Sequence, residues 1–207
     1  MIRFRKNLWL LLLVAGIPAS QAENPTQDLG FTVFRDNCMA CHLQSGMGIK
    51  EMNAPSIAGL PRWYVTDQLR KFRRDQRGYH RDDASGNLMQ ANALALDERS
   101  IAFVGRHIES LAPNAQRNTL NIETHANAQN EYDQHCASCH GDAAQGDRAR
   151  RVPPLTSQQD WYLLGQIEKF AAGKRVHAED DSLNRLDSDT VESIVAWIAS
   201  LPAPASQ

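Results

Sequence analysis

The sequence predicts an all-α protein of two similar domains in tandem, on three observations. Aligning the 207-residue chain with itself at an offset of 98 gives an ungapped match over more than forty residues. Apolar residues recur at helical spacing near the end of each repeat, and no stretch alternates convincingly as a half-buried strand would. The chain is long enough for two small domains, whose modest cores often need a covalent or metal staple.

The first residues have the pattern of an export signal and are excluded from the fold. Three cations among residues 3–6 precede an apolar run over residues 8–17, and residues 20–22 are small and polar enough for a signal peptidase to read. A run of about ten residues is too short to span a bilayer unaided. We expect residues 1–22 to be a cleaved signal peptide and the mature protein to be periplasmic, either soluble or peripherally membrane-associated.

The charge of the mature chain excludes one class of partner. Without the three leading cations, 19 Lys+Arg remain against 24 Asp+Glu, a net charge of about −5. This balance argues against nucleic acid as a partner. No later segment is long and apolar enough to span a membrane.

Each repeat is expected to form about three main helices joined by long irregular segments. The first helix ends in a cysteine cluster, and the second covers residues 63–72 and, in the second repeat, 161–170. The third begins at Asp97 or Asp187, either of which can cap a helix. Its apolar residues are Ile101, Val104, Ile108 and Leu111 in one repeat and Val191, Ile194, Val195, Ile198 and Leu201 in the other.

Matched residues tie the two repeats together. The pairs are Phe34 with Tyr132, Cys38 with Cys136, Cys41 with Cys139, His42 with His140, Pro55 with Pro153, Tyr64 with Tyr162, Gln68 with Gln166, Lys71 with Lys169, Phe72 with Phe170 and Arg77 with Arg175. Beyond Arg77 the offset falls to 90, so the second repeat lacks eight residues between Arg175 and Leu186.

A polar segment containing Pro and Asn separates the repeats and is interpreted as a linker. The resulting division is a signal peptide at 1–22, a first domain at 23–112, a linker at 113–123, a second domain at 124–203 and a tail at 204–207. The segment at 44–52 is too irregular for a compact helical domain unless a bulky group fills the space that it encloses.

All four cysteines fall in two C-x-x-C-H motifs, residues 38–42 and 136–140. Two cysteines three apart lie on one face of a helical turn, where their sulfurs can reach the two vinyl groups of one haem. The histidine that follows offers an imidazole to the iron, and the pentad is the attachment signal of c-type haem. A redox disulfide and a zinc site are the competing interpretations, but two motifs in register favour two covalent haem c groups.

Two domains of about 90 residues, each with C-x-x-C-H and then a Pro-x-hydrophobic element, resemble the tandem dihaem class I cytochromes c of the c-four group. The resemblance covers nearly the whole mature chain and implies class I cytochrome c domains folded around covalent haem. It implies that a proline carbonyl holds each motif histidine by a hydrogen bond. The residues in these roles are Cys38, Cys41, His42 and Pro55 in the first domain, and Cys136, Cys139, His140 and Pro153 in the second.

The same resemblance implies a methionine as sixth ligand, seven residues before the leucine that leads into the last helix. Met89 stands at that position in the first domain, so we assign His42 and Met89 as the axial pair of the first haem. The rival sixth ligand is His80, and weaker candidates are Met47 and Met52.

The second domain departs from this pattern, because all five methionines precede it. The position seven before its leucine is Glu179, a poor ligand for low-spin haem iron. Imidazole binds haem iron well, so we assign His177 as the partner of His140. The alternatives are water, Lys174, no ligand at all or, more distantly, His125.

These ligands predict an electrochemical difference between the two haems. Replacing a thioether by imidazole favours ferric iron and lowers the potential. We therefore expect the second haem to have the lower potential and electrons to leave through the first domain.

No nucleophile–base or carboxylate pair indicates catalysis, so we expect an electron-transfer protein rather than an enzyme. Its partners would be redox proteins, namely a respiratory donor complex or dehydrogenase and a terminal oxidase or reductase. If the second haem lacked a sixth ligand, a sensor or small enzyme that binds a gas or peroxide would be the alternative. A subunit of a larger oxidoreductase complex is a third possibility.

Two groups of cations could dock an acidic redox partner, or could simply be solvated. The first group is Arg70, Lys71, Arg73, Arg74 and Arg77, and the second is Arg148, Arg150 and Arg151.

Overall fold

The computed structural model describes residues 25–202 except 121, 178–182 and 184. Its helices form two groups of similar design, one from each repeat, and no strand beyond two isolated bridges forms within these ranges. The predicted all-α fold of two domains is therefore confirmed. The expected signal peptide at 1–22, Glu179 and the tail at 204–207 lie outside the described residues.

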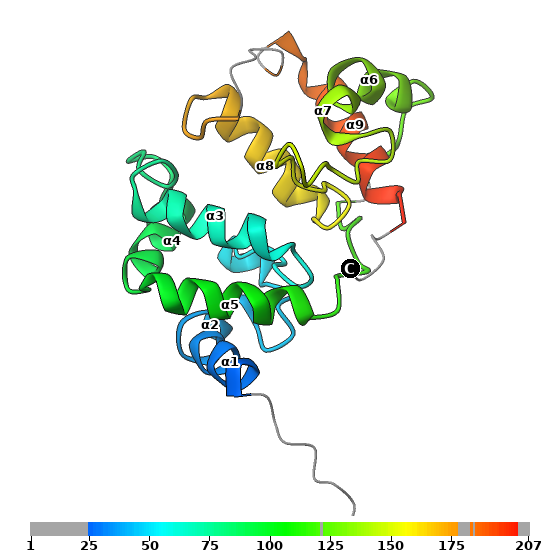
Figure 1. Ribbon diagram of the computed structural model, residues 1–207. Helices are drawn as coiled ribbons and strands as arrows, with labels where there is room; N and C mark the ends of the chain where they lie inside the picture. Colours follow the sequence, from blue (N-terminus) through cyan, green and yellow to red (C-terminus); the bar gives the residue numbers. More distant parts are fainter. Residues whose placement is uncertain (1–24, 121, 178–182, 184, 203–207) are drawn as a thin grey trace, which may run out of the picture.

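In the first domain, the first helix crosses the last helix (Figure 1). Its elements are α1 (Pro25–Asn37), α2 (Met39–His42), the 3₁₀ turn η1 (Lys50–Met52), α3 (Arg62–Arg73), α4 (Ala84–Leu94) and α5 (Glu98–Ser110). The α1–α5 crossing is close because Gly30 has no side chain: a Cβ there would meet the Phe103 carbonyl oxygen at 2.7 Å. Phe34, Val104 and Ile108 are buried where these helices meet the rest of the domain.

The second domain repeats this arrangement with a shorter chain. Its elements are α6 (Ala128–His135), α7 (Ala137–His140), α8 (Asp160–Ala171) and α9 (Ser188–Ser200). Tyr132 takes the place of Phe34 and packs on Trp197 of α9, with ring centres 4.6 Å apart. The same core position is therefore filled by an aromatic residue in both domains.

The predicted helix starts are confirmed at the last helix of each domain. Asp97 accepts a hydrogen bond from the Ser100 N–H at 2.7 Å, and Asp187 accepts one from the Thr190 N–H at 2.9 Å. These caps satisfy backbone donors that the first turn of a helix leaves unpaired. The second helices, α3 and α8, extend one residue beyond the predicted bounds at each end.

Helix α4 is a fourth helix in the first domain, beyond the three predicted. Asp83 caps it by accepting from the Gly86 N–H at 2.9 Å, and of its residues only Gly86 and Ala93 are buried. The apolar residues of this helix do not gather on one face, so it lacks the amphipathic pattern that is the usual sequence signal of a helix. It also lies in the segment without a counterpart in the second repeat, so the internal comparison could not find it.

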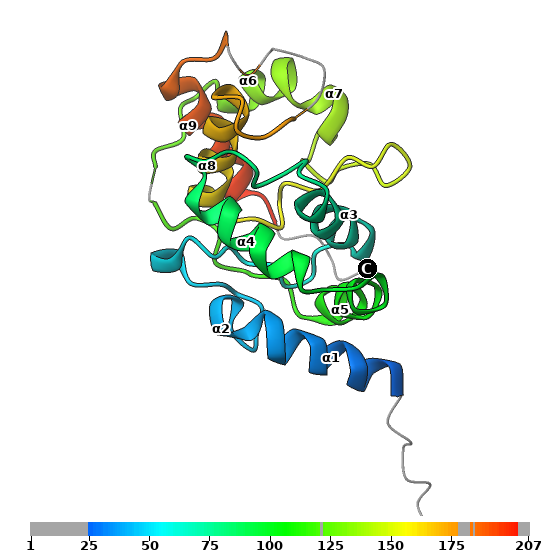
Figure 2. The same ribbon diagram turned by 90° about the vertical axis from the view of Figure 1, so that its left-hand side faces the viewer.

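The two domains lie against each other (Figures 1 and 2), and side chains of α3 and α8 contribute to the contact. The Ser56 N–H donates to Gln159 Oε1, and Gln158 Nε2 donates to the Ser56 carbonyl, both at 2.8 Å. Arg151 pairs with Asp67 of the other domain at 3.1 Å, so this arginine belongs to the interface. Polar contacts between buried and half-buried groups thus join the domains.

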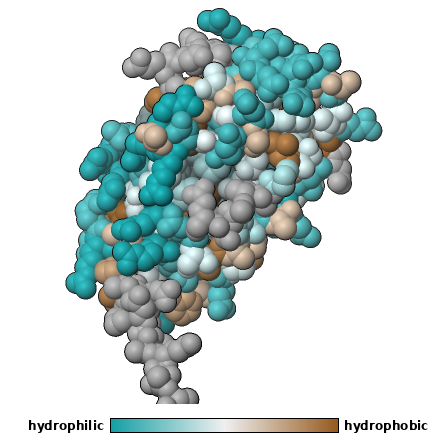
Figure 3. Space-filling model, turned by 45° about the vertical axis from the view of Figure 1, so that its right-hand side comes forward, coloured by the Kyte–Doolittle hydropathy of each residue, from teal (hydrophilic) through white to brown (hydrophobic). Residues whose placement is uncertain are grey.

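The surface is hydrophilic over most of the face in Figure 3, with apolar side chains scattered across it. The exposed large apolar residues of the described chain include Leu88, Leu94 and Val176. Among the helices that the structure describes, none combines the length and the apolar character needed to cross a membrane.

Candidate functional site

The two C-x-x-C-H motifs share one backbone conformation. Each forms a single helical turn after a break in the preceding helix, at Cys38 and at Cys136. The His42 N–H donates to the Cys38 carbonyl at 2.9 Å, and the His140 N–H donates to the Cys136 carbonyl at the same distance. The duplicated sequence therefore builds the same turn twice.

The residue after each motif has a positive φ, which reverses the chain. Leu43 has φ 62° and Gly141 has φ 80°. The loop that follows folds back, since the Gly48 N–H donates to the His42 carbonyl at 3.0 Å. This return brings a proline carbonyl next to each motif histidine.

Each motif histidine donates its Nδ1–H to the proline carbonyl that the resemblance implied. The distance is 2.8 Å from His42 to Pro55 and 3.0 Å from His140 to Pro153. A carbonyl oxygen can only accept, so Nδ1 carries the proton and Nε2 keeps its lone pair. An oriented imidazole of this tautomer is what a metal ion requires of a histidine ligand.

Burial keeps these imidazoles neutral. Burial of His42 lowers its pKa, and this effect outweighs that of the hydrogen bond to Pro55, which raises the pKa. The pKa of His140 is lowered by burial and also by the charge of His177, against the opposing bond to Pro153. Both rings are therefore in the metal-binding form near neutral pH.

The cysteines are placed for attachment rather than for redox chemistry. All four are free thiols, and burial raises the pKa of Cys38 to about 12 and that of Cys136 to about 11. A thiol that takes part in disulfide exchange needs a lowered pKa, so the raised values of Cys38 and Cys136 disfavour that chemistry. Among the described residues, no group of three or more His, Cys, Asp or Glu side chains is placed to hold a zinc ion. The environment of the motifs thus argues against a redox disulfide or a zinc site.

A cavity in the first domain opens between the attachment turn and α4. Its walls include Cys38, Cys41, His42 and Met89, so the cavity joins the attachment motif to the proposed methionine ligand. The walls otherwise carry mainly apolar side chains of α3, α4 and α5. A flat apolar group with an iron centre fits this combination of thiols, imidazole and thioether.

The rival ligands of the first haem are placed differently. Met52 also lines the cavity, whereas His80 and Met47 are not among its walls. His80 Nδ1 accepts from the Asp82 N–H at 3.2 Å, and the Met47 carbonyl accepts from Gln159 of the second domain.

In the second domain the rings of His140 and His177 lie near each other. Their centres are 6.1 Å apart and their planes lie within 15° of parallel. Metal–imidazole bonds are about 2 Å long, so two rings bound on opposite sides of one metal ion have centres about 6 Å apart. His177 is exposed but packs on Phe170, with ring centres 4.8 Å apart. The other candidate histidine, His125, lies just before α6, where its backbone N–H donates to Ser193 Oγ at 3.2 Å.

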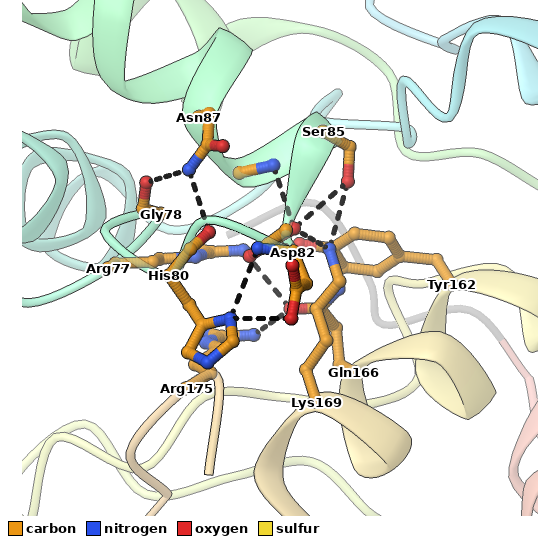
Figure 4. A network of polar contacts seen from close by, with 12 residues as sticks. Arg77, Gly78, His80, Asp82, Ser85, Asn87, Tyr162, Gln166, Lys169 and Arg175 are labelled. Atoms are coloured by element: carbon orange, nitrogen blue, oxygen red, sulfur yellow. Dashed lines mark hydrogen bonds and ion pairs between the residues drawn. The ribbon is translucent and has the colours of Figure 1, made fainter. Parts of the chain in front are cut away.

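Two arginines meet between the domains, and neither was among the residues assigned to a site (Figure 4). Each donates to a glutamine of its own domain and to a tyrosine of the other. The bonds run from Arg77 to Gln68 (2.7 Å) and Tyr162 (2.6 Å), and from Arg175 to Gln166 (2.5 Å) and Tyr64 (3.3 Å). The repeat already paired all of these residues, and that pairing was the available signal.

Arg77 does not belong to the exposed basic run in which the sequence placed it. Helix α3 ends at Arg73, and Arg77 is 9% exposed. Of the remaining run, Arg70 and Arg73 pair with Glu98 at 2.9 and 2.8 Å. Much of this run is therefore occupied within its own domain.

Among the described residues, no carboxylate pairs with the positive charges of Arg77 and Arg175. Burial and the positive charge of Arg77 lower the pKa of Arg175, although arginine stays protonated in proteins. Within the described ranges, no carboxylate lies at ion-pair distance from either guanidinium. Arg77 also lines the first cavity. Haem carries two propionate groups, and guanidinium groups in this position fit such anions.

Comparison with known proteins agrees with this geometry. The Cytochrome c family matches residues 27–112 and again residues 125–202. A cytochrome c-552 of Acidithiobacillus ferridurans is 26% identical, over 92% of this chain and 84% of the relative. A thiosulfate dehydrogenase electron acceptor of Thiomonas intermedia (strain K12) is also 26% identical, over 89% of this chain and 84% of the relative.

Solved structures show the same fold. Thiosulfate dehydrogenase from Marichromatium purpuratum superposes with a TM-score of 0.68 and 27% identity, over 87% of this chain but only 42% of that one. Cytochrome c4 from Pseudomonas stutzeri has a TM-score of 0.67 and 19% identity, over 84% of this chain and 98% of the other. The family match covers both domains, and each domain carries its own attachment motif. The chain therefore belongs to the cytochrome c family, as a dihaem electron-transfer cytochrome with two covalently attached haem c groups.

Proposed function

We propose that the protein is a periplasmic electron carrier between a dehydrogenase or respiratory donor complex and a terminal oxidase or reductase. The bound haems supply one-electron Fe(III)/Fe(II) couples. The observation that carries the proposal is the pairing of candidate axial ligands in each domain. His42 shares a cavity with Met89, and His140 lies near His177. Two protein ligands on each iron leave no position for a substrate, which suits a carrier.

The chain's own residues hold the haems in fixed positions. Cys38 and Cys41 attach one haem through thioether bonds, and Cys136 and Cys139 attach the other. The carbonyls of Pro55 and Pro153 fix the orientation and tautomer of the histidine ligands. Fixed ligands reduce rearrangement between the two oxidation states, as electron transfer requires.

The interface arginines are proposed to bind propionate groups at the junction of the domains. Charge-assisted bonds from guanidinium to carboxylate are among the stronger hydrogen bonds in proteins. Because Arg77 and Arg175 each reach into both domains, they would hold the two haem edges in one polar cluster.

The difference in axial ligands between the two haems would give electron transfer through the protein a direction. A His/His pair favours ferric iron more than a His/Met pair does. We therefore propose that the second haem has the lower potential and receives electrons first, and that the first domain passes them on.

Named relatives support a particular class of donor. The similar protein of Thiomonas intermedia is described as an electron acceptor of thiosulfate dehydrogenase, so a sulfur-compound dehydrogenase is the donor that we propose. This chain has no cysteine besides the four in its attachment motifs, which argues against its oxidising thiosulfate itself. A relative described as the CcoP subunit of a cbb3-type oxidase is 27% identical, and the chain spans 61% of it. That similarity keeps a subunit role as the alternative.

The test is to measure the spin state and ligand binding of the purified holoprotein. We expect the ferric protein to show two low-spin haems by electron paramagnetic resonance, and the ferrous protein to bind no carbon monoxide. A thiosulfate dehydrogenase should reduce it in stopped-flow mixing. A high-spin haem in the untreated protein, or carbon monoxide bound at one haem, would instead support a gas sensor or a small enzyme.

A further inference from the structure

An ion pair between the domains breaks their twofold similarity. Lys169 of α8 places its Nζ 2.6 Å from Asp83 Oδ1. The same ammonium group donates to Ser85 Oγ at 2.9 Å (Figure 4). The Asp83 side chain is 4% exposed and that of Lys169 is 22% exposed. A cation of the second domain therefore reaches the first turn of α4, the helix that carries Met89.

Helix α4 depends on polar contacts for its position. Of its residues only Gly86 and Ala93 are buried, and its larger apolar side chains Leu88 and Met89 line the cavity instead of packing into a protein core. Asn87 donates to the carbonyls of Gly78 and His80, at 2.7 and 3.0 Å. A segment with few buried apolar contacts opens locally at low cost, so each polar anchor matters.

Asp83 is the central anchor of α4. Its carboxylate caps the helix by accepting from the Gly86 N–H, and the fit is close, since a Cβ on Gly86 would meet Asp83 Oδ2 at 2.2 Å. Burial raises the pKa of Asp83, but the bonds from Lys169 and Gly86 outweigh it and hold the pKa below its usual range. The carboxylate is thus a buried charge, and such a charge is costly unless it is paired.

The matching lysine of the first domain has a different role. Lys71 pairs with Asp67 of its own helix at 3.2 Å, with 46% of the lysine side chain exposed. Asp83 itself lies in the segment that the second repeat lacks. Among the residues that the structure describes, the contact between Lys169 and Asp83 therefore has no symmetry mate, and it acts on the first domain.

We propose that Lys169 is a positioning residue for the sixth ligand of the first haem. By neutralising Asp83 it holds the start of α4, and so keeps Met89 on the wall of the cavity. Docking of the second domain thereby sets how firmly Met89 stays in place. The inference rests on the proposed role of Met89 as a ligand.

The test uses the full-length holoprotein and measures how fast an added ligand displaces the methionine. Ferric protein is mixed with excess imidazole, and the loss of the weak long-wavelength band of methionine-ligated haem is followed. Lys169→Gln removes the cation. Asp83→Asn removes the charge but keeps an acceptor that caps helices equally well. We expect both variants to speed the displacement roughly five- to tenfold, the effect of losing one charge-assisted contact.

Two further variants separate positioning from general stability. Lys169→Arg keeps the cation and should stay near the wild-type rate. Lys71→Gln removes the matching lysine and should leave the rate unchanged. Circular dichroism establishes that each variant is folded, and Asp83→Asn decides the question alone if Lys169→Gln does not fold.

The outcomes distinguish failure of this inference from failure of the ligand assignment. Wild-type rates in both Lys169→Gln and Asp83→Asn, or an equal acceleration in Lys71→Gln, overturn the positioning role. Met89→Ala is measured in parallel. If it retains the long-wavelength band, Met89 is not the ligand, and the assignment and this inference fail together. If it loses the band while Lys169→Gln behaves as wild type, only this inference fails.

Discussion

The imidazole rings of His140 and His177 lie 6.1 Å apart, centre to centre, within 15° of parallel. Rings in face-to-face contact would be much closer, whereas two ligands on opposite sides of one iron have about this separation. His177 comes from the part of the second domain where the sequence departs most from its relatives' pattern. This separation and this angle are what the proposed His140/His177 ligand pair requires.

Replacing His177 by alanine should open the second haem. We expect the ferric His177→Ala protein to show one high-spin and one low-spin haem by electron paramagnetic resonance, and the ferrous protein to bind one equivalent of carbon monoxide. The potential of the second haem should rise, because loss of an imidazole ligand disfavours ferric iron. His80→Ala is the matched control and should leave both haems low-spin. Two low-spin haems in His177→Ala would show that another group is the ligand.

A glycine after the first attachment motif should stabilise the protein. Leu43 has φ 62° and ψ 165°, a region that only glycine occupies without strain. Such strain costs about 1–3 kcal/mol, and part of the gain is offset by the greater freedom of glycine in the unfolded chain. We expect Leu43→Gly to add about 1 kcal/mol of stability and to raise the melting temperature by about 2–4 °C. The matching change at Gly141, to alanine, should destabilise, because the φ of 80° there strains any residue that carries a Cβ. A lower melting temperature for Leu43→Gly would contradict the strain argument.

The parts of the site that could be predicted from the sequence are those with local spacing rules. The attachment motifs, the proline partners and the capping residues Asp97 and Asp187 each depend on contacts within a few residues or within one loop. The duplication strengthened every one of them, because each pattern occurs twice in register.

The parts that could not be predicted depend on how the domains meet. Nothing in the local sequence of Arg77 indicates that it donates to Tyr162, 85 residues away. Asp83 and Lys169 have no counterpart pair in the repeat, so neither spacing nor symmetry connects them. Helix α4 was not predicted either, because polar contacts and not an apolar stripe hold it in place.

Replacing the interface arginine Arg77 by an uncharged residue should change the potential of the first haem. Arg77 lines the first cavity, and loss of its positive charge should make ferric iron more stable. We expect Arg77→Gln to lower the potential of the first haem, by on the order of 1 kcal/mol of reduction free energy. Spectroelectrochemical titration resolves the two haems. The control is Arg74→Gln, three residues earlier on the exposed surface. A shift of equal size in Arg74→Gln would mean that the effect is one of net charge alone.

Acid stability should depend on His107, which packs between aromatic rings at the crossing of α1 and α5. Its ring lies 4.9 Å from that of Phe34 and 5.7 Å from that of Phe31, centre to centre, and its buried Nε2 finds no hydrogen-bond partner among the described residues. Burial lowers the pKa of His107 below the ordinary value of about 6.5 that the unfolded chain retains. The unfolded state therefore binds a proton at a pH where the folded state does not.

The sign of the pH dependence follows from this difference in proton binding. The contribution of neutral His107 is fully present above about pH 6.5 and is lost as the pH falls toward the lower pKa of the folded state. Trp197 occupies the matching position in the second domain, so an aromatic ring suits this packing. We expect His107→Phe to lose less stability than the wild type between pH 7 and pH 5, in denaturant titrations of the ferric holoprotein. His125→Gln removes an exposed histidine at the start of the second domain and should follow the wild-type curve. If the curves of His107→Phe and wild type stay parallel over this range, His107 takes up no proton on unfolding and the packing argument is wrong.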